Sequence, residues 1–373
     1  MIRRVGVNLT WLTPGVVGGS EESTTDVLRA IAESSAPTPT IELFAAPGFG
    51  AAHPDLAAHF RTHVMPGESP SRVARVVAEH RWLPAALRDA DVDLVHHAGG
   101  TAPLWGVHPY SLTVHDLQPL DQPANFSVVK RLYLRSMIGR SARGARRIGV
   151  PSVFVRDGLI ARFGLNAEQV TVVPWSVRAA MVPSPEERAA ARRRLGIGER
   201  YLLFPAITHP HKNHATLLTA FDRVAASDPE IELVMCGGAG RAEAAVESQR
   251  SSLRHGDRVR RVGRIDRVEL DGLFADAVAL GFPSRYEGFG LPVLEAMAAG
   301  CPVICSSTTA LGEVAGGGAE LVAPDDVVGW VAAIASVLAE STTARSERIA
   351  IGRARAATFG PARSADATLS LWS

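Results

Sequence analysis

The stretch VALGFPSRYEGFGLPVLEAMAAG, residues 278–300, has the pattern of a buried strand, a glycine-containing loop and a helix. Its first residues are an apolar run, which is typical of a strand covered on both faces. Gly288 and Gly290 permit close backbone approach in the loop. Pro292 suits the first helical position, where its missing N–H leaves no bond unmade, and Gly300 suits the helix end. The stretch therefore predicts a strand–loop–helix unit of an α/β protein.

Strand-like and helix-like runs alternate on both sides of this unit, which predicts parallel sheets covered by helices. The alternation restarts near residue 180, after the proline-containing stretch MVPSPEER at 181–188. We therefore expect two such sheets, in two domains that face each other across a cleft. Ligands bind such sheets where strands end and helices begin, so the loops at those ends are the candidate sites.

The composition limits the classes of protein that the chain can belong to. Apolar residues make up 46% and charged residues 21%, as in a soluble globular protein, and a net charge of +1 gives no global field for nucleic acid. Three cysteines in 373 residues indicate buried free thiols and a reducing cytoplasm rather than a disulfide framework. The N-terminal MIRRVGVNLTWL predicts a first strand rather than a signal peptide.

Two glutamates flank the loop of the opening stretch. Free N–H groups of residues 290–293, aided by the helix dipole, predict an anion site. Glu295 in the first helical turn would repel a phosphate, so we expect it to accept hydrogen bonds from a diol such as ribose. Glu287 would lie where a sugar or reacting group binds. The alternative is that these glutamates merely favour a helix N-terminus.

Lys212 and His115 also follow predicted strands. The chain has 39 basic residues, of which only Lys130 and Lys212 are lysines, so a lysine indicates a need for a compact charge, as beside a diphosphate. His115 can hydrogen-bond a sugar hydroxyl or hold its loop. The structural alternatives are a solvated lysine and a buried histidine. Gly18 and Gly19, before a helix that Ser20 could cap, form a candidate phosphate loop.

Several of these stretches together resemble the retaining glycosyltransferases of family GT4. PSRYEGFGLPVLEAMAAGCPVICS resembles the family's glutamate–seven–glutamate signature. FPAITHPHKNHATLLTAF is similar to its lysine loop, LTVHDLQPLDQPANFS to its histidine–aspartate loop, and GVVGGSEEST to its N-terminal glycine loop. The resemblance implies the GT-B fold, with an acceptor-side Rossmann-like domain at 1–180 and a donor-binding one at 181–355. It also implies a C-terminal helix, about 356–373, that packs back onto the first domain.

The resemblance assigns roles to individual residues. The implied catalytic residues are His115, Glu287 and Lys212. The implied donor-binding residues are Gly18, Gly19, Lys212, Arg264, Ile265, Glu287, Gly288, Phe289, Gly290, Leu291 and Glu295. On the acceptor side we expect His96, His97 and Asp116, although Asp116 has the alternative role of fixing its loop. The chain departs from the family at Ala206, where an arginine that helps bind phosphate is expected; His209, His211 and Arg264 are the candidate substitutes.

The predicted function is transfer of a hexose from a nucleotide-diphosphate sugar to a hydroxyl of a glycan, glycolipid or small-molecule acceptor. PHKNH at 210–214 is similar to mannosyltransferases, which favours GDP-mannose over a UDP-sugar. No cofactor is expected, because Lys130 lies in a basic helical stretch and Lys212 is assigned to the diphosphate, which leaves no lysine for a Schiff base with pyridoxal phosphate. No metal is expected, because Asp89, Asp91 and Asp93 precede a strand, at the wrong end of the sheet. A sugar-nucleotide epimerase and a non-catalytic sugar-nucleotide binder are the alternatives.

Residues 129–147 form a basic helical stretch with apolar residues among its arginines. Its simpler interpretation is a helix with one wet face. The alternative is peripheral contact with an anionic membrane that carries the acceptor, at the inner face of the plasma membrane.

Overall fold

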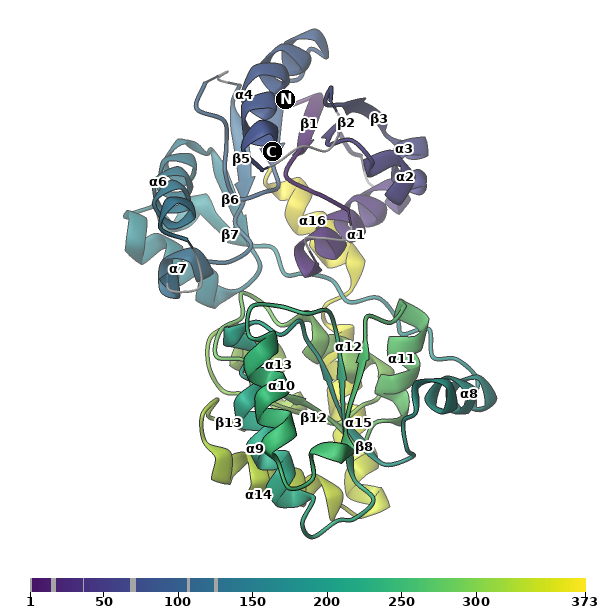
Figure 1. Ribbon diagram of the computed structural model, residues 1–373. Helices are drawn as coiled ribbons and strands as arrows, with labels where there is room; N and C mark the ends of the chain where they lie inside the picture. The colour runs from purple at the N-terminus through teal and green to yellow at the C-terminus, as the bar shows by residue number, and fades with distance from the viewer. Residues whose placement is uncertain (1, 15–17, 36, 68–71, 106–107, 124–126) are drawn as a thin grey trace. The chain divides into compact units, whose positions relative to one another are not determined.

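The computed structural model describes residues 2–14, 18–35, 37–67, 72–105, 108–123 and 127–373. The chain forms two compact units, one made of Met1–Ser176 with Pro361–Ser373 and one of Val177–Gly360. Strands and helices alternate through both units, and each unit holds a parallel sheet (Figure 1). The predicted α/β fold class with two parallel sheets is therefore confirmed.

The sheet of the first unit has, within the described residues, the order β3-β2-β1-β4-β5-β6-β7, and its printed pairs are all parallel. The order reverses between β1 and β4, which makes the carboxyl ends of those two strands the natural place for a ligand. The strands are β1 (Arg4–Leu9), β2 (Thr40–Ala45), β3 (Arg61–Val64), β4 (Leu94–His97), β5 (Tyr110–Thr113), β6 (Arg147–Val150) and β7 (Val170–Val172).

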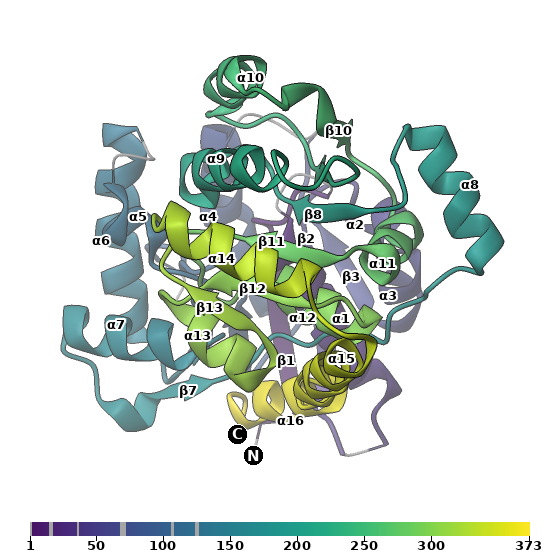
Figure 2. The ribbon, with the colours of Figure 1, turned by 90° about the horizontal axis from the view of Figure 1, so that it is seen from below.

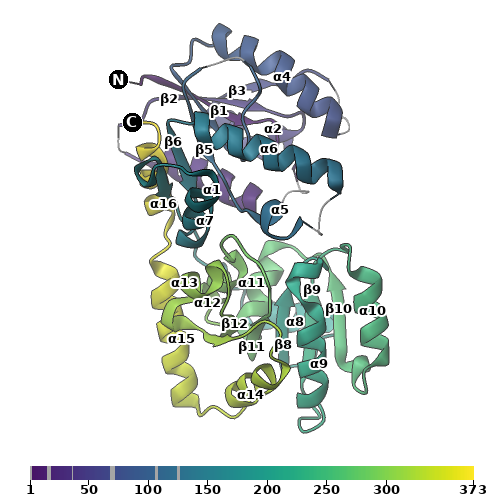
Figure 3. The ribbon, with the colours of Figure 1, turned by 90° about the vertical axis from the view of Figure 1, so that its left-hand side faces the viewer.

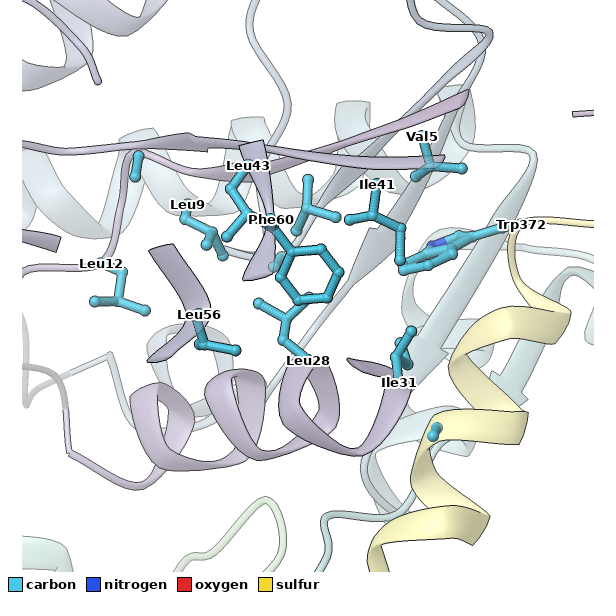
Figure 4. Packing of buried hydrophobic residues seen from close by; sticks show 14 of the residues in the cluster. Val5, Leu9, Leu12, Leu28, Ile31, Ile41, Leu43, Leu56, Phe60 and Trp372 are labelled. Carbon is cyan, nitrogen blue, oxygen red and sulfur yellow. The ribbon is translucent and has the colours of Figure 1, made fainter. Parts of the chain in front are cut away.

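Helices cover both faces of this sheet. They are α1 (Gly19–Glu33), α2 (Phe49–Ala52), α3 (Pro54–His59), α4 (Arg72–Asp89), α5 (Gln118–Asp121), α6 (Val128–Gly144), α7 (Val153–Phe163), the 3₁₀ turn η2 (Ala167–Gln169) and α16 (Pro361–Ser370). Helix α16, at the yellow end of the chain, packs against α1 (Figure 1). Trp372, just past α16, is buried near Val5 of β1 and Ile31 of α1 (Figure 4). The first unit thus needs both ends of the chain to complete its core.

The sheet of the second unit has, among the described residues, the order β10-β9-β8-β11-β12-β13, again with parallel pairs. The order reverses between β8 and β11, so the loops after these two strands lie side by side at one sheet edge. The strands are β8 (Tyr201–Pro205), β9 (Glu232–Cys236), β10 (Val259–Gly263), β11 (Ala279–Phe282), β12 (Val303–Ser306) and β13 (Glu320–Val322).

The helices of the second unit alternate with its strands or follow them. They are α8 (Pro185–Leu195), η3 (Pro210–Lys212), α9 (His214–Val224), α10 (Glu243–Ser252), η4 (Gly256–Arg258), α11 (Arg267–Asp276), α12 (Leu291–Ala299), α13 (Ala310–Ala315), η5 (Gly316–Gly318), α14 (Val327–Leu338) and α15 (Thr342–Ala357). Helix α8 starts with a reciprocal capping box of Ser184 and Glu187 and ends at Gly196, with φ 65°. It lies next to α11 (Figure 2), and α15 runs beside α12 (Figure 3).

The three cysteines, Cys236, Cys301 and Cys305, are free and buried, as predicted, and burial raises each thiol pKa to about 12. Among the described residues no single helix is long and apolar enough to cross a membrane. Helix α14 and the segment Thr342–Ser370 meet that test only as a pair, which is bent by 113°.

Candidate active site

Two of the predicted catalytic residues meet in the second unit. Lys212 ends η3, which follows β8, and Glu287 lies in the loop between β11 and α12. The Nζ of Lys212 donates to Glu287 Oε1 at 2.7 Å, although the residues are 75 positions apart. Both side chains are mostly buried, with exposures of 18% and 13%, and Nζ lies 5.2 Å from the ring centroid of Phe282. The reversal of strand order thus brings a cation and a carboxylate to one point.

The Lys212 loop is fixed by its neighbours. Asn213 adopts φ 56°, and its Nδ2 donates to the Pro324 carbonyl at 2.7 Å and to Asp325 Oδ1 at 3.2 Å. Arg285 Nε donates to the same Asp325 oxygen at 2.8 Å. Asp325 therefore joins the loop after β8 to the loop after β11. This link keeps Lys212 and Glu287 next to each other.

In the loop before α12, the backbone rather than the apolar side chains is available to a ligand. Gly290 has φ 100°, a conformation that glycine adopts without strain. Phe289 and Leu291 are buried, and the Phe289 ring packs edge-on against Phe359 at 5.6 Å. The prediction of residues 289 and 291 as donor-binding can therefore hold only for their peptide groups. Gly288, between Glu287 and Phe289, belongs to the same loop.

The predicted set of N–H donors at the start of α12 is too large. Leu291, not Pro292, is the first helical residue, and Pro292 is the second. Proline has no N–H, and the Val293 N–H already donates to the Gly290 carbonyl at 3.0 Å. An anion site at this helix end would use the peptides that precede Pro292.

Glu295 has a partner that the sequence analysis missed. Its buried carboxylate accepts a hydrogen bond from Arg267 Nη1, and Arg267 Nε lies 3.0 Å from Asp271 Oδ1. Arg267 is the first residue of α11 and comes from a different strand-end loop, so sequence spacing alone gave no signal for the pair. A ribose diol would have to share Glu295 with this guanidinium.

The loop after β10 places Arg264 and Ile265, where the resemblance seats the base. Gly263 has φ 70°, and its carbonyl accepts from the Gly237 N–H at 2.7 Å, which joins this loop to the one after β9. Arg264 is exposed and Ile265 is half-buried.

Charge favours Arg264, which lies near the loop after Ala206, over the histidines as the cation that compensates for Ala206. A Cβ at Gly238 would lie 3.0 Å from Arg264 Nε, and the Gly238 carbonyl accepts from the Thr208 N–H at 3.3 Å, two residues beyond Ala206. Burial, with the charge of Lys212 nearby, lowers the pKa of His211 to about 3 and also lowers that of His209. Both imidazoles are therefore neutral at pH 7, whereas a guanidinium stays charged.

In the first unit, His115 lies beyond β5 between two tryptophan rings. Its Nε2 is 2.7 Å from the Ala98 carbonyl, which fixes that nitrogen as the N–H donor. Nδ1 is buried and has no hydrogen-bond partner among the described residues, so it is left as an unused acceptor. The ring centroids of Trp11 and Trp175 lie 5.5 Å and 5.7 Å away. Burial lowers the pKa of His115 to about 4, so the imidazole is neutral at pH 7.

The N-terminal glycine loop lies close to Trp175, which contacts His115. Gly18 is exposed, with φ 76°, and precedes α1, whose Glu21 N–H donates to the Gly18 carbonyl at 2.8 Å. A Cβ at Gly19 would lie 3.3 Å from the Trp175 ring, which itself packs on His115. Residues 15–17 of the predicted loop lie outside the described residues.

His96 and His97 end β4 but are buried, which does not fit exposed acceptor contacts. His96 Nδ1 lies 2.8 Å from Ser111 Oγ, and its Nε2 lies 3.0 Å from Thr113 Oγ1, so both ring nitrogens are used. His97 Nδ1 is 3.0 Å from Asn8 Nδ2. Burial lowers the pKa of each histidine to about 3.

Two aspartates accept hydrogen bonds from backbone N–H groups. Asp116 Oδ1 accepts from the Gln118 N–H at 3.0 Å, which is the loop-fixing alternative given above. Asp93 Oδ2 accepts from the N–H groups of Arg3 and Arg4 at 2.7 and 3.0 Å, and these bonds lower its pKa. Within the described ranges, no group of three or more His, Cys, Asp or Glu side chains is arranged to hold a metal ion.

The chain has two Rossmann-like units. One has a lysine–glutamate pair at its switch point, and the other has a histidine beyond its central strands. These features are those of a GT-B glycosyltransferase. Known proteins agree with this class. Residues 17–181 match Glycosyltransferase Family 4, and residues 187–355 match Glycosyl transferases group 1. The chain belongs to this family of glycosyltransferases.

Named relatives and solved structures extend the comparison. The chain is 30% identical to the O-antigen chain mannosyltransferase RfbU of Salmonella typhimurium over 65% of this chain and 63% of the relative. It is 29% identical to an O-antigen chain mannosyltransferase B of Escherichia coli, over 58% and 57%. The matches thus span less than two thirds of these relatives.

Two solved structures show the same fold. A sucrose-phosphate synthase from Thermosynechococcus elongatus has a TM-score of 0.79 at 21% identity, covering 99% of this chain and 98% of that one. The Anabaena protein HepE, in complex with UDP-glucose, has a TM-score of 0.77 at 18% identity, with 98% of each chain covered.

Proposed function

We propose that the protein is a retaining glycosyltransferase that moves a hexose from a nucleotide-diphosphate sugar to a hydroxyl of a glycan, glycolipid or small molecule. The observation that carries this proposal is the 2.7 Å bond between Lys212 and Glu287 at the switch point of the second sheet. A compact cation there suits a diphosphate, and a carboxylate beside it suits the hydroxyls of the attached sugar.

The chemistry requires the leaving diphosphate to be stabilised as the glycosidic bond breaks. Lys212, Arg264 and the peptides before Pro292 supply positive charge or N–H donors at strand-end loops of one unit. Glu287 orients the sugar, and the donor's own phosphate oxygen takes the proton of the acceptor hydroxyl. Attack from the face that the diphosphate leaves then keeps the anomeric configuration.

His115 has a matching role on the sugar. Because Nε2 donates to Ala98 and the ring is neutral at pH 7, Nδ1 is the nitrogen left to accept a hydrogen bond, and a sugar hydroxyl would have to reach it in its buried position. A neutral acceptor positions the sugar without acting as a proton donor, so we assign it a binding role rather than acid catalysis.

Mannose is the favoured hexose, with GDP-mannose as donor and a UDP-sugar as the alternative. Two relatives named mannosyltransferases support the first choice, and the fold neighbour HepE, in complex with UDP-glucose, supports the second. The base would contact Arg264 and Ile265 through their backbone, which explains why side chains say little about its identity.

A panel of UDP, GDP, GDP-mannose, UDP-glucose and dTDP-sugars tests the proposal by thermal shift and then by transfer to acceptors. A ligand at a hundred times its dissociation constant adds about 2.7 kcal/mol of stability, enough for a clear shift. NMR of the new linkage should show the donor's anomeric configuration. Inversion would contradict the mechanism, conversion of the donor to an epimerised nucleotide sugar would identify an epimerase, and binding without turnover would identify a sugar-nucleotide binder.

We further propose that α6 contacts an anionic membrane, at the inner face of the plasma membrane. Val128 and Leu132 are exposed, at 60% and 59%, beside Arg131 and Arg135 of the same helix. Met137 and Ile138, by contrast, belong to the core. The wild-type protein should sediment with vesicles containing anionic phosphatidylglycerol, and Leu132→Glu should reduce that binding severalfold. Equal binding to neutral vesicles would contradict the electrostatic part.

A further inference from the structure

Thr309 holds a backbone conformation that threonine adopts rarely. It precedes α13 with φ 58° and ψ −139°. Among the described residues, Asp91 and Asn213 also have positive φ, but their short polar side chains tolerate it better. A β-branched residue at positive φ is strained, and such strain persists only where the surroundings hold it.

The strained residue contacts the candidate site directly. The Glu287 N–H donates to Thr309 Oγ1 at 3.1 Å, and the Ala310 N–H donates to the Glu287 carbonyl at 3.4 Å. Residues 309 and 310 therefore hold the peptide groups on both sides of the Glu287 Cα. The position of Oγ1 depends on the Thr309 backbone, so the unusual φ and this hydrogen bond belong to one arrangement.

The same segment also packs on the rest of the loop. A Cβ added to Gly290 would lie 2.4 Å from Leu311 Cδ2, which shows how closely the start of α13 approaches the start of α12. Movement of residues 309–311 would therefore move Glu287, whose carboxylate carries the bond to Lys212.

We infer that Thr309 is a positioning residue: its hydroxyl fixes the Glu287 backbone, and thereby the Glu287 carboxylate, for the proposed sugar transfer. It acts through Glu287 and not on the substrate. The inference rests on the proposed function, because it assigns Glu287 a role in the reaction. A glycine would relieve the strain at this position but would lack the hydroxyl.

Four variants separate the hydroxyl from the backbone. Thr309→Val keeps the branch and removes the hydroxyl, Thr309→Gly removes both, and Thr309→Ser keeps the hydroxyl. Thr308→Val is the matched control, because the neighbouring Thr308 hydroxyl has no hydrogen-bond partner in the described part of the chain.

We expect Thr309→Val and Thr309→Gly to lower kcat about five- to tenfold, with the donor KM changed less than about twofold. Thr309→Ser and Thr308→Val should stay within about twofold of wild type. Thr309→Gly should melt at a higher temperature than Thr309→Val and yet be no more active, which a purely structural role for Thr309 would not produce. Full activity in Thr309→Gly, or loss in Thr309→Ser equal to that in Thr309→Val, would overturn the inference.

Hydrogen exchange of the Glu287 amide supplies a readout that needs no turnover. It should be about fivefold or more faster in Thr309→Val and Thr309→Gly than in wild type, Thr309→Ser and Thr308→Val. Unchanged exchange would overturn the inference even if transfer is observed. Absence of transfer by the wild-type protein with every donor would refute the proposed function, while exchange would still decide whether the Thr309 hydroxyl holds Glu287.

Discussion

Lys212 is paired with the Glu287 carboxylate before any donor binds, so its charge is already compensated in the free protein. A diphosphate would have to draw the ammonium into additional bonds, since three N–H donors can serve Glu287 and phosphate oxygens together. A guanidinium has a planar, rigid set of donors and cannot reproduce this arrangement. The choice of lysine in a chain that otherwise uses arginine follows from this geometry.

Replacement of Lys212 tests that view. Lys212→Ala should weaken nucleoside-diphosphate binding about ten- to a hundredfold, the range expected for hydrogen bonds to charged groups, and nucleoside binding much less. Lys212→Arg should also be impaired. Calorimetric titration of both ligands measures the ratio; equal loss for the two would exclude a diphosphate role.

The two glutamates should respond differently to conversion to glutamine. Glu287→Gln should lower kcat, because contacts beside the breaking bond strengthen in the transition state, whereas Glu295→Gln should mainly raise the donor KM. Glu295→Gln should also lower the melting temperature, since it weakens the contact with Arg267. Steady-state kinetics with each variant decides this, and the opposite pattern would mean that the roles are exchanged.

At the scale of single elements, the glycine before α12 is constrained by its backbone conformation and by a close neighbour. Gly290→Ala should destabilise the protein by about 1–2 kcal/mol from positive φ alone, and by more because its Cβ would collide with Leu311. Gly317→Ala is the control, because a Cβ there would meet nothing within 4 Å. Thermal unfolding compares the two; equal melting temperatures would contradict the packing described for this loop.

Local signals predicted the strand–loop–helix unit at 278–300, including the end of α12 at Gly300, where φ is 84°. They could not show which way loop side chains point, because that depends on distant residues. Phe289 faces the core since Phe359 lies there, and Glu295 meets Arg267 only because α11 and α12 are neighbours. The two tryptophans around His115 come from positions 11 and 175 and were missed for the same reason.

For the whole molecule, the buried histidines predict acid sensitivity. Burial lowers the pKa values of His96, His97 and His211 to about 3 and those of His115 and His214 to about 4. Above pH 6.5 neither state binds these protons. As the pH falls below 6.5, the unfolded chain takes up protons that the folded chain refuses, so stability is lost from there toward pH 4.

Thermal unfolding between pH 8 and 5 measures this loss, because most carboxylates titrate at lower pH. Each such histidine contributes a slope on the order of 1.4 kcal/mol per pH unit below 6.5. His96→Gln should flatten the dependence. A melting temperature that stays constant from pH 7 to pH 5 would show that these side chains are accessible to protons in the folded state.

Because residues 361–373 return to the first unit, the two units are completed in a fixed order during synthesis of the chain. Residues 177–360 form the second unit from one continuous segment, so it has all its parts once that segment leaves the ribosome. The first unit is translated earlier, but the core beneath α1 stays open until Leu371 and Trp372, both almost fully buried, have been made. During synthesis the earlier unit is thus the later one to close, and the apolar side chains of β1 and α1 stay uncovered by Leu371 and Trp372 throughout that interval.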